Sequence, residues 1–180
     1  REALLIDAGG SAASVLDAAA PDPIRALRIV DEAVADAGDG RLALDDARVV
    51  ALAQALSEPT VRDEAMRRCV GPTAAAAEQL WTALARETPD PEAAEPAALL
   101  AVSALLRGDG ALANVALDRA EAAWPGHRLT AVLRTVVEAG MRPAEVRRLL
   151  RDTLAAPTGA PALRRAGGSA RTPRRRRPSR

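Results

Sequence analysis

Apolar residues recur at three- and four-residue intervals along most of this chain, and proline, glycine or aspartate interrupts them after short stretches. No segment keeps the two-residue alternation of a β-strand for long. This pattern is typical of amphipathic helices joined by tight turns. We therefore predict an all-α fold with about eight helices in antiparallel hairpins.

Several helix boundaries can be predicted from single residues. Asp22-Pro23 places a capping carboxylate before a proline at the first helical position, and Asp45 precedes another apolar stripe. Gly108 is expected to take the left-handed conformation that closes one helix, and Asp109 to cap the next. These features predict helix starts near residues 23, 46 and 110.

Further starts are predicted at Thr60, in a capping box with Asp63, at Thr73, and at Pro96. A short helix after Gly9-Gly10 is also possible. The expected helices span about residues 11–19, 22–38, 45–58, 60–70, 73–88, 96–107, 109–124, 128–139 and 143–154.

The sequence contains neither Phe nor Tyr, so the core must consist mainly of Leu, Val and Ala. Trp81 and Trp124 are both expected in that core as its large anchors. We predict three regions: a poorly defined segment over residues 1–20, a helical domain over 21–154, and a disordered tail over 155–180, where apolar periodicity stops.

The net charge of +1 conceals an uneven distribution. Residues 1–163 carry 17 Arg and 24 acidic side chains, whereas residues 164–180 carry 8 Arg and no acid. Such a tail could contact phosphates non-specifically, because it has no aromatic residue to stack on bases. The alternatives are a solubilising tail or compositional drift. The candidate nucleic-acid contacts are Arg171, Arg174, Arg175, Arg176 and Arg177.

The chain has no Lys, Phe or Tyr and a single Asn, which we interpret as the product of a GC-rich, bacterial genome. Cys69 is the only cysteine, so no intramolecular disulfide can form and a cytoplasmic location is expected. No apolar run is long enough for a transmembrane helix, and no membrane contact is expected. The chain begins at Arg1 rather than Met, which fits a fragment, so the absence of a signal peptide carries no conclusion.

No motif supports a catalytic site, a metal site or a cofactor. Cys69 has no base near it in sequence, and His127 is the only histidine, so it is expected to help begin a helix. A phosphate-binding loop is excluded because its glycine spacing and its lysine are missing. An enzyme is therefore the less favoured interpretation.

The most distinctive segment is residues 107–129, which has two interpretations. Structurally, the spacing of Ala113, Leu117, Ala120 and Pro125 fits the second helix of a tetratricopeptide-type hairpin, although no second copy exists. Functionally, polar side chains of this segment could gather near one end and bind a small ligand or a partner. That candidate cluster is Arg107, Asp109, Asn114, Asp118, Arg119 and His127.

This segment, together with Leu99-Leu100-Ala101 and residues 139–143, resembles the C-terminal signature of an actinobacterial family catalogued as domain of unknown function 4192. Residues 61–63 and 81–89 are also similar to that family, so the resemblance spans about residues 42–150. Family members are usually longer, with an additional N-terminal half. The resemblance implies no activity, cofactor or catalytic residue.

Three functions are therefore compared. The favoured one is a non-enzymatic helical module whose hairpin surface binds a protein partner. The second is a nucleic-acid-associated protein that uses the arginine-rich tail, and the third is a ligand-binding protein or enzyme that uses the polar cluster at residues 107–119.

Overall fold

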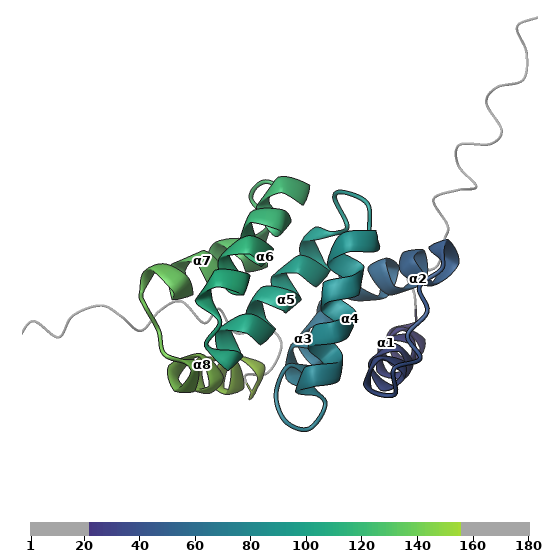
Figure 1. Ribbon diagram of the computed structural model, residues 1–180, viewed down its shortest axis with the longest axis horizontal. Helices are drawn as coiled ribbons and strands as arrows, with labels where there is room; N and C mark the ends of the chain where they lie inside the picture. Colours follow the sequence, from purple (N-terminus) through teal and green to yellow (C-terminus); the bar gives the residue numbers. More distant parts are fainter. Residues whose placement is uncertain (1–21, 156–180) are drawn as a thin grey trace, which may run out of the picture.

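The computed structural model describes residues 22–155, which form eight α-helices without any strand (Figure 1). The all-α prediction is confirmed. The expected helix at 11–19, the segment 1–20 and nearly all of the tail lie outside the described residues. The helices are α1 (Pro23–Gly38), α2 (Asp46–Ser57), α3 (Pro59–Arg68), α4 (Ala74–Glu87), α5 (Ala94–Arg107), α6 (Gly110–Ala123), α7 (Arg128–Glu138) and α8 (Pro143–Ala155).

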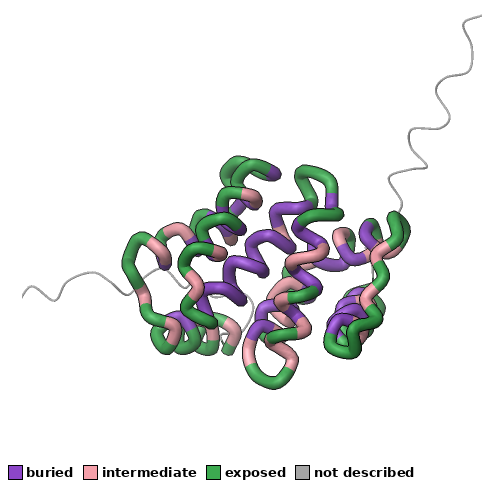
Figure 2. The backbone as a smooth tube through the Cα atoms, in the orientation of Figure 1, coloured by how far each residue is buried: buried purple, intermediate pink, exposed green. Residues whose placement is uncertain are grey.

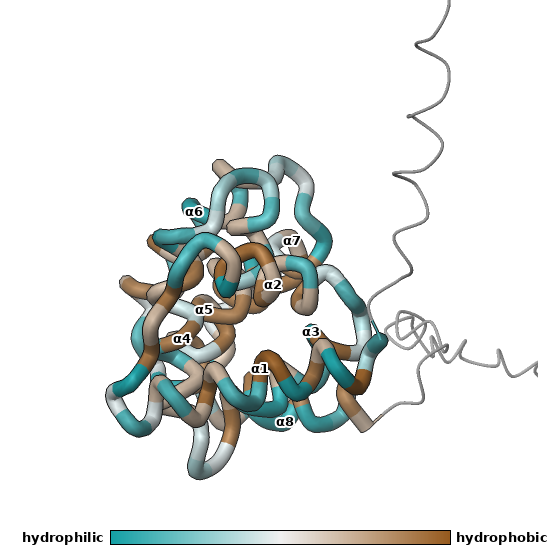
Figure 3. The backbone as a smooth tube through the Cα atoms, turned by 90° about the vertical axis from the view of Figure 1, so that its right-hand side faces the viewer, coloured by the Kyte–Doolittle hydropathy of each residue, from teal (hydrophilic) through white to brown (hydrophobic). Residues whose placement is uncertain are grey.

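Helix α5 is the centre of the fold. It lies between α4 and α6, and α2, α3, α7 and α8 also pack on it (Figure 1). Every residue from 96 to 106 is buried, so α5 is enclosed on all sides rather than amphipathic (Figure 2). The hydropathy of the residues agrees with this burial. Apolar stretches mark α5, while hydrophilic stretches are prominent on the peripheral α8 (Figure 3).

The predicted aspartate caps are confirmed. Asp22, Asp45 and Asp109 each accept a hydrogen bond from a backbone N–H of the first helical turn, at 3.1, 2.8 and 2.9 Å. Gly108 has φ of +85°, which L-residues with a side chain rarely adopt, and it closes α5 directly before Asp109 caps α6. These local interactions fix the α5–α6 hairpin.

Two threonine caps were predicted wrongly. Helix α3 begins at Pro59, because proline fits the first helical position, and Thr60 therefore lies inside the helix. Thr73 precedes α4 as expected, but its hydroxyl donates to the carbonyl of Arg68 at 3.2 Å instead of capping the helix. The N-terminus of α4 consequently has no side-chain cap.

The two tryptophans have different roles. Trp81 on α4 is fully buried, as predicted, whereas Trp124 is 52% exposed, so the prediction of a core position for it is wrong. Trp124 follows the last residue of α6 in an extended conformation, with φ of −143°, and leaves the buried stripe. Its ring lies beside that of His127, with the centroids 5.6 Å apart.

Small side chains allow α5 and α6 to pack closely. Ala101 and Ala104 on α5 and Ala113, Ala116 and Ala120 on α6 are buried, and this helix pair packs more extensively than any other pair among the described residues. Alanine has no side chain beyond Cβ, so helix axes can approach with little loss of side-chain entropy. The predicted hairpin over residues 107–129 is therefore present.

An ion pair joins the first two helices. Asp36 on α1 accepts a hydrogen bond from the Arg48 guanidinium on α2 at 2.6 Å, and Arg41 lies 3.6 Å from its other oxygen. The hydrogen bond from Arg48 is the main reason why the pKa of Asp36 is held below its ordinary value. The ionised carboxylate is thus stabilised more in the folded protein than in the unfolded chain.

Asp36→Asn is expected to lower the free energy of unfolding at pH 7, and this difference from wild type should disappear in acid. A carboxyl whose pKa is lowered by folding stabilises the protein above its unfolded pKa, and that contribution is lost as the pH falls through the folded value, below about pH 4. Urea unfolding at pH 7 and pH 3 measures the difference. Asp152→Asn, in an exposed pair 3.9 Å from Arg148, is the control. A difference that stays constant between the two pH values would contradict this assignment.

Candidate functional site

The polar residues predicted to gather around α6 are distributed over separate places. Arg107, at the end of α5, pairs with Glu78 on α4 at 2.9 Å and with Asp109 at 3.2 Å. Asp109 also caps α6 through its other carboxylate oxygen. Both residues therefore connect the α5–α6 turn to α4.

Asn114 and Asp118, four residues apart, share one face of α6. Both accept hydrogen bonds from Arg134 on α7, at 3.3 Å in the case of Asn114. The amide of Asn114 also donates to the carbonyl of Gly110 at 2.9 Å. These contacts bridge α6 to α7.

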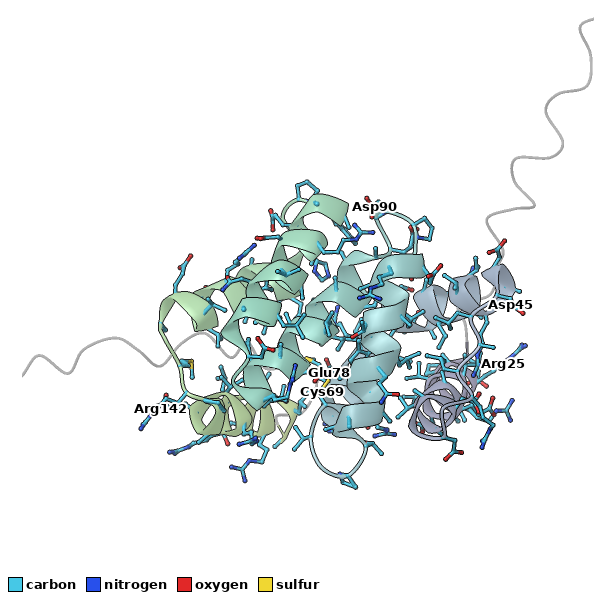
Figure 4. All side chains as sticks on the ribbon, viewed as in Figure 1. Arg25, Asp45, Cys69, Glu78, Asp90 and Arg142 are labelled. Atoms are coloured by element: carbon cyan, nitrogen blue, oxygen red, sulfur yellow. The ribbon has the colours of Figure 1, made fainter. Side chains whose placement is uncertain are left out.

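Arg119 points toward the connection between α4 and α5. It pairs with Asp90 at 2.7 Å and donates to the carbonyls of Ala85 and Thr88 at 3.2 and 3.5 Å. Asp90 lies in the connecting loop at the edge of the molecule, well away from Glu78 (Figure 4). Arg119 therefore belongs to a different group from Arg107.

His127 is in a third place. It follows the C-terminal end of α6, whereas Asp109 lies at the N-terminal end. It precedes α7, as predicted, and its side chain is buried. Its Nε2 lies 3.2 Å from Glu95 on α5 and its Nδ1 lies 2.8 Å from the Thr130 hydroxyl. Glu95 also accepts from Arg62 on α3 at 3.2 Å. The expected gathering of His127 with Arg107 and Asp109 does not occur, because the whole of α6 separates them.

All six predicted residues thus have partners within the protein, and those partners join neighbouring helices. A role in ligand binding remains a prediction for them. The five candidate nucleic-acid contacts, Arg171, Arg174, Arg175, Arg176 and Arg177, lie outside the described residues.

Cys69 follows α3 and is buried. Its thiol lies 3.6 Å from the Ala65 carbonyl and 3.9 Å from that of Leu99. Burial raises the pKa of the Cys69 thiol to about 11, so the sulfur is protonated at neutral pH. The Ser103 and Trp81 side chains beside the sulfur offset part of this rise. Cys69 is therefore unsuited to nucleophilic chemistry.

An apolar groove of about 250 Å³ lies among α3, α5, α7 and α8. Helices α7 and α8 both pack on α5, yet they hardly contact each other, so the groove remains open between them. Of the residues that line it, Val102, Leu133, Val136 and Val146 are buried, while Val132 and Leu149 are 51% and 42% exposed. Its lining residues are Arg62, Asp63, Met66, Val102, Arg128, Leu129, Val132, Leu133, Val136, Val146, Leu149, Leu150 and Thr153.

The two walls of the groove have the same helical spacing. Residues 129, 132, 133 and 136 of α7 line it, as do residues 146, 149, 150 and 153 of α8. Each set is an i, i+3, i+4, i+7 stripe, which is the pattern by which one helix packs against another. The groove thus presents two helix-packing stripes to the same space.

Sequence reasoning did not identify this groove. The α7 and α8 stripes are visible as periodic apolar positions, but an apolar stripe ordinarily indicates a face covered by the core. Only the arrangement of α7 and α8 around α5 shows that part of each stripe stays uncovered.

No helix within residues 22–155 is both long and apolar enough to cross a bilayer. In the same range, no three His, Cys, Asp or Glu side chains lie together in a way that could hold a metal ion.

Comparison with known proteins places the chain in a family. No curated protein and no solved structure matches it. The family described as "Domain of unknown function (DUF4192)" matches residues 3–144, which is most of the chain and extends the resemblance at residues 42–150 toward the N-terminus. The chain therefore belongs to the DUF4192 family.

Proposed function

We propose that the helical body of this protein is a non-enzymatic interaction module, and that the groove among α3, α7 and α8 binds an amphipathic helix of a protein partner. The observation that carries the proposal is the pair of i, i+3, i+4, i+7 stripes on α7 and α8, which face one space that no described element fills. Helix-in-groove recognition uses this type of surface. A partner helix with an apolar stripe of about two turns would match the length of both walls.

Charges at the rim specify the partner further. Arg128 at the start of α7 and Asp63 on α3 line the groove, and neither has an ion-pair partner within residues 22–155. A partner helix with an acidic residue near Arg128 and a basic residue near Asp63 would therefore be favoured over one of reversed charge.

The rest of the body supports binding rather than catalysis. Its only histidine is buried between Glu95 and Thr130, and its only cysteine is buried and protonated at neutral pH. The polar residues around α6 are engaged in contacts between helices. The groove adds apolar positions, Val132 and Leu149, that packing within residues 22–155 leaves uncovered.

Val132→Glu tests this function against the matched variant Val115→Glu. Both valines are more than half exposed, Val132 in the groove and Val115 on α6, so neither new carboxylate is forced into the core. Tagged wild-type and variant proteins are purified from the native host and the bound proteins are quantified by mass spectrometry. We expect at least one partner protein to be recovered with wild type and with Val115→Glu. Its recovery should fall about tenfold or more with Val132→Glu, because the new carboxylate at position 132 must be desolvated in an apolar contact.

Thermal unfolding of both variants provides the control, since their stabilities should be similar. Equal recovery of every bound protein by Val132→Glu and Val115→Glu would contradict the proposal.

A further inference from the structure

The charged residues that line the groove lie together at the end where α7 begins. They are Arg62, Asp63 and Arg128, and the other lining residues are uncharged. Arg62 lies 3.2 Å from Oε1 of Glu95, and His127 lies at the same distance from the same oxygen. Since Arg128 directly follows His127, both arginines belong to this end of the groove. Two positive charges there face one negative charge, which favours an acidic group of a partner.

Arg62 is held in place but only partly hydrogen-bonded. One terminal nitrogen of its guanidinium donates to Oε1 of Glu95, and this is its one hydrogen bond within residues 22–155. Arginine has five N–H donors, and its pairs with carboxylates often use two of them in parallel. Here the pair is single, since Oε2 of Glu95 is buried and has no hydrogen-bond partner in the described part of the chain. The remaining N–H groups of Arg62 are therefore open to a second acceptor.

The surroundings of Arg62 suit a second carboxylate. Its side chain is 28% exposed, so it is reached from the groove but is only partly solvated. Because Glu95 already orients the guanidinium, a second carboxylate would bind it with little further loss of side-chain entropy. Asp63, the next residue on α3, forms no ion pair with Arg62 among residues 22–155 and leaves these donors unoccupied.

We infer that the partner helix carries an aspartate or glutamate at one end of its apolar stripe, and that this carboxylate binds Arg62, with Arg128 beside it. This contact rests on the proposed function, because the acid reaches Arg62 only when a helix lies in the groove. Arg62 is then a specificity-determining residue. A helix with the same apolar stripe but a neutral or basic residue at that end would bind more weakly, because it offers no acceptor to the guanidinium.

A displayed library of helical peptides, selected on the full chain, tests this inference. Every peptide has leucine at positions i, i+3, i+4 and i+7, and glutamate, glutamine or lysine elsewhere. We expect the selected peptides to share a glutamate at one end of the leucine stripe. Replacing that glutamate by glutamine should weaken binding to wild type about fivefold or more in fluorescence anisotropy, since a charge-assisted hydrogen bond is lost.

Variants of the protein separate recognition by Arg62 from a purely structural role. With Arg62→Gln, the same change in the peptide should cost less than about twofold, because the two groups no longer interact. A structural role alone would weaken both peptides equally. Arg62→Lys keeps a positive charge beside Glu95 if Arg62→Gln fails to fold, and it should lose part of the fivefold factor. Arg148→Gln, on α8 but outside the groove, is the control and should keep the whole factor.

Two results would overturn the inference while leaving the interaction function in place. One is a set of selected peptides that share no glutamate, and the other is an equal loss on replacing the glutamate in wild type and in the Arg62 variants. If instead no peptide with the leucine stripe binds wild type more tightly than it binds Val132→Glu, the proposed function itself fails, and the inference fails with it.

Discussion

Trp81→Ala should lower the free energy of unfolding by about 3–5 kcal/mol, the range measured for loss of a large buried aromatic side chain. Trp81 is fully buried on α4 and is the largest side chain in a core that otherwise contains Leu, Val, Ala, Met66 and Cys69. Few neighbours are large enough to move into the space that Trp81 leaves. Most of the cavity should therefore remain, and it should add its full share to the loss of stability.

Trp124→Ala is the matched control. Because Trp124 is half exposed and its ring lies beside that of His127, its loss should cost about 1 kcal/mol or less. Chemical denaturation of both variants, followed by circular dichroism, gives the two free energies. Similar losses for the two variants would show that Trp81 is not the anchor of the core.

Glu95→Ala should have the second largest effect, at most about 3–5 kcal/mol, because it breaks a partly buried ion pair and leaves Arg62 unpaired. The Glu95 side chain is 13% exposed and lies between Arg62, at 3.2 Å, and His127, at 3.2 Å. These residues belong to α3, α5 and the start of α7, so one carboxylate connects three parts of the fold.

Glu32→Ala provides the comparison for this variant. Glu32 pairs with Arg28 on the surface of α1, where both side chains are largely exposed, and such pairs contribute about 0–1 kcal/mol. Urea unfolding at pH 7 measures both. If Glu95→Ala were no more destabilising than Glu32→Ala, the cluster would not be a structural connection between the helices.

The structure also indicates which features a single sequence can predict. The caps at Asp22, Asp45 and Asp109 were predictable because each depends on backbone groups within three residues. The left-handed turn at Gly108 is equally local. The core of mainly Leu, Val and Ala followed from the absence of Phe and Tyr, and the buried residues confirm it.

Features that depend on distant residues were not predictable in this way. The position of Trp124 depends on the extended backbone that ends α6. Helical periodicity alone extends the buried face of α6 to Trp124, whereas the helix ends at Ala123. The cluster of Arg62, Glu95 and His127 joins residues far apart in sequence, and no local pattern pairs them. The groove depends on how α7 and α8 sit around α5, which is a property of packing rather than of either helix.

Photo-cross-linking from position 149 tests whether the groove among α3, α5, α7 and α8 binds a helix of another protein. Leu149 lines the groove and is 42% exposed, so a photoreactive residue there faces the proposed partner. The same residue at position 115 on α6 is the control. Cross-linked peptides from the native host are identified by mass spectrometry.

We predict cross-links from position 149, and not from position 115, to an amphipathic helical segment of one other protein. Cross-links from position 149 only to residues 1–21 of the same chain, only to a second copy of this protein, or at the same frequency as from position 115, would contradict the claim.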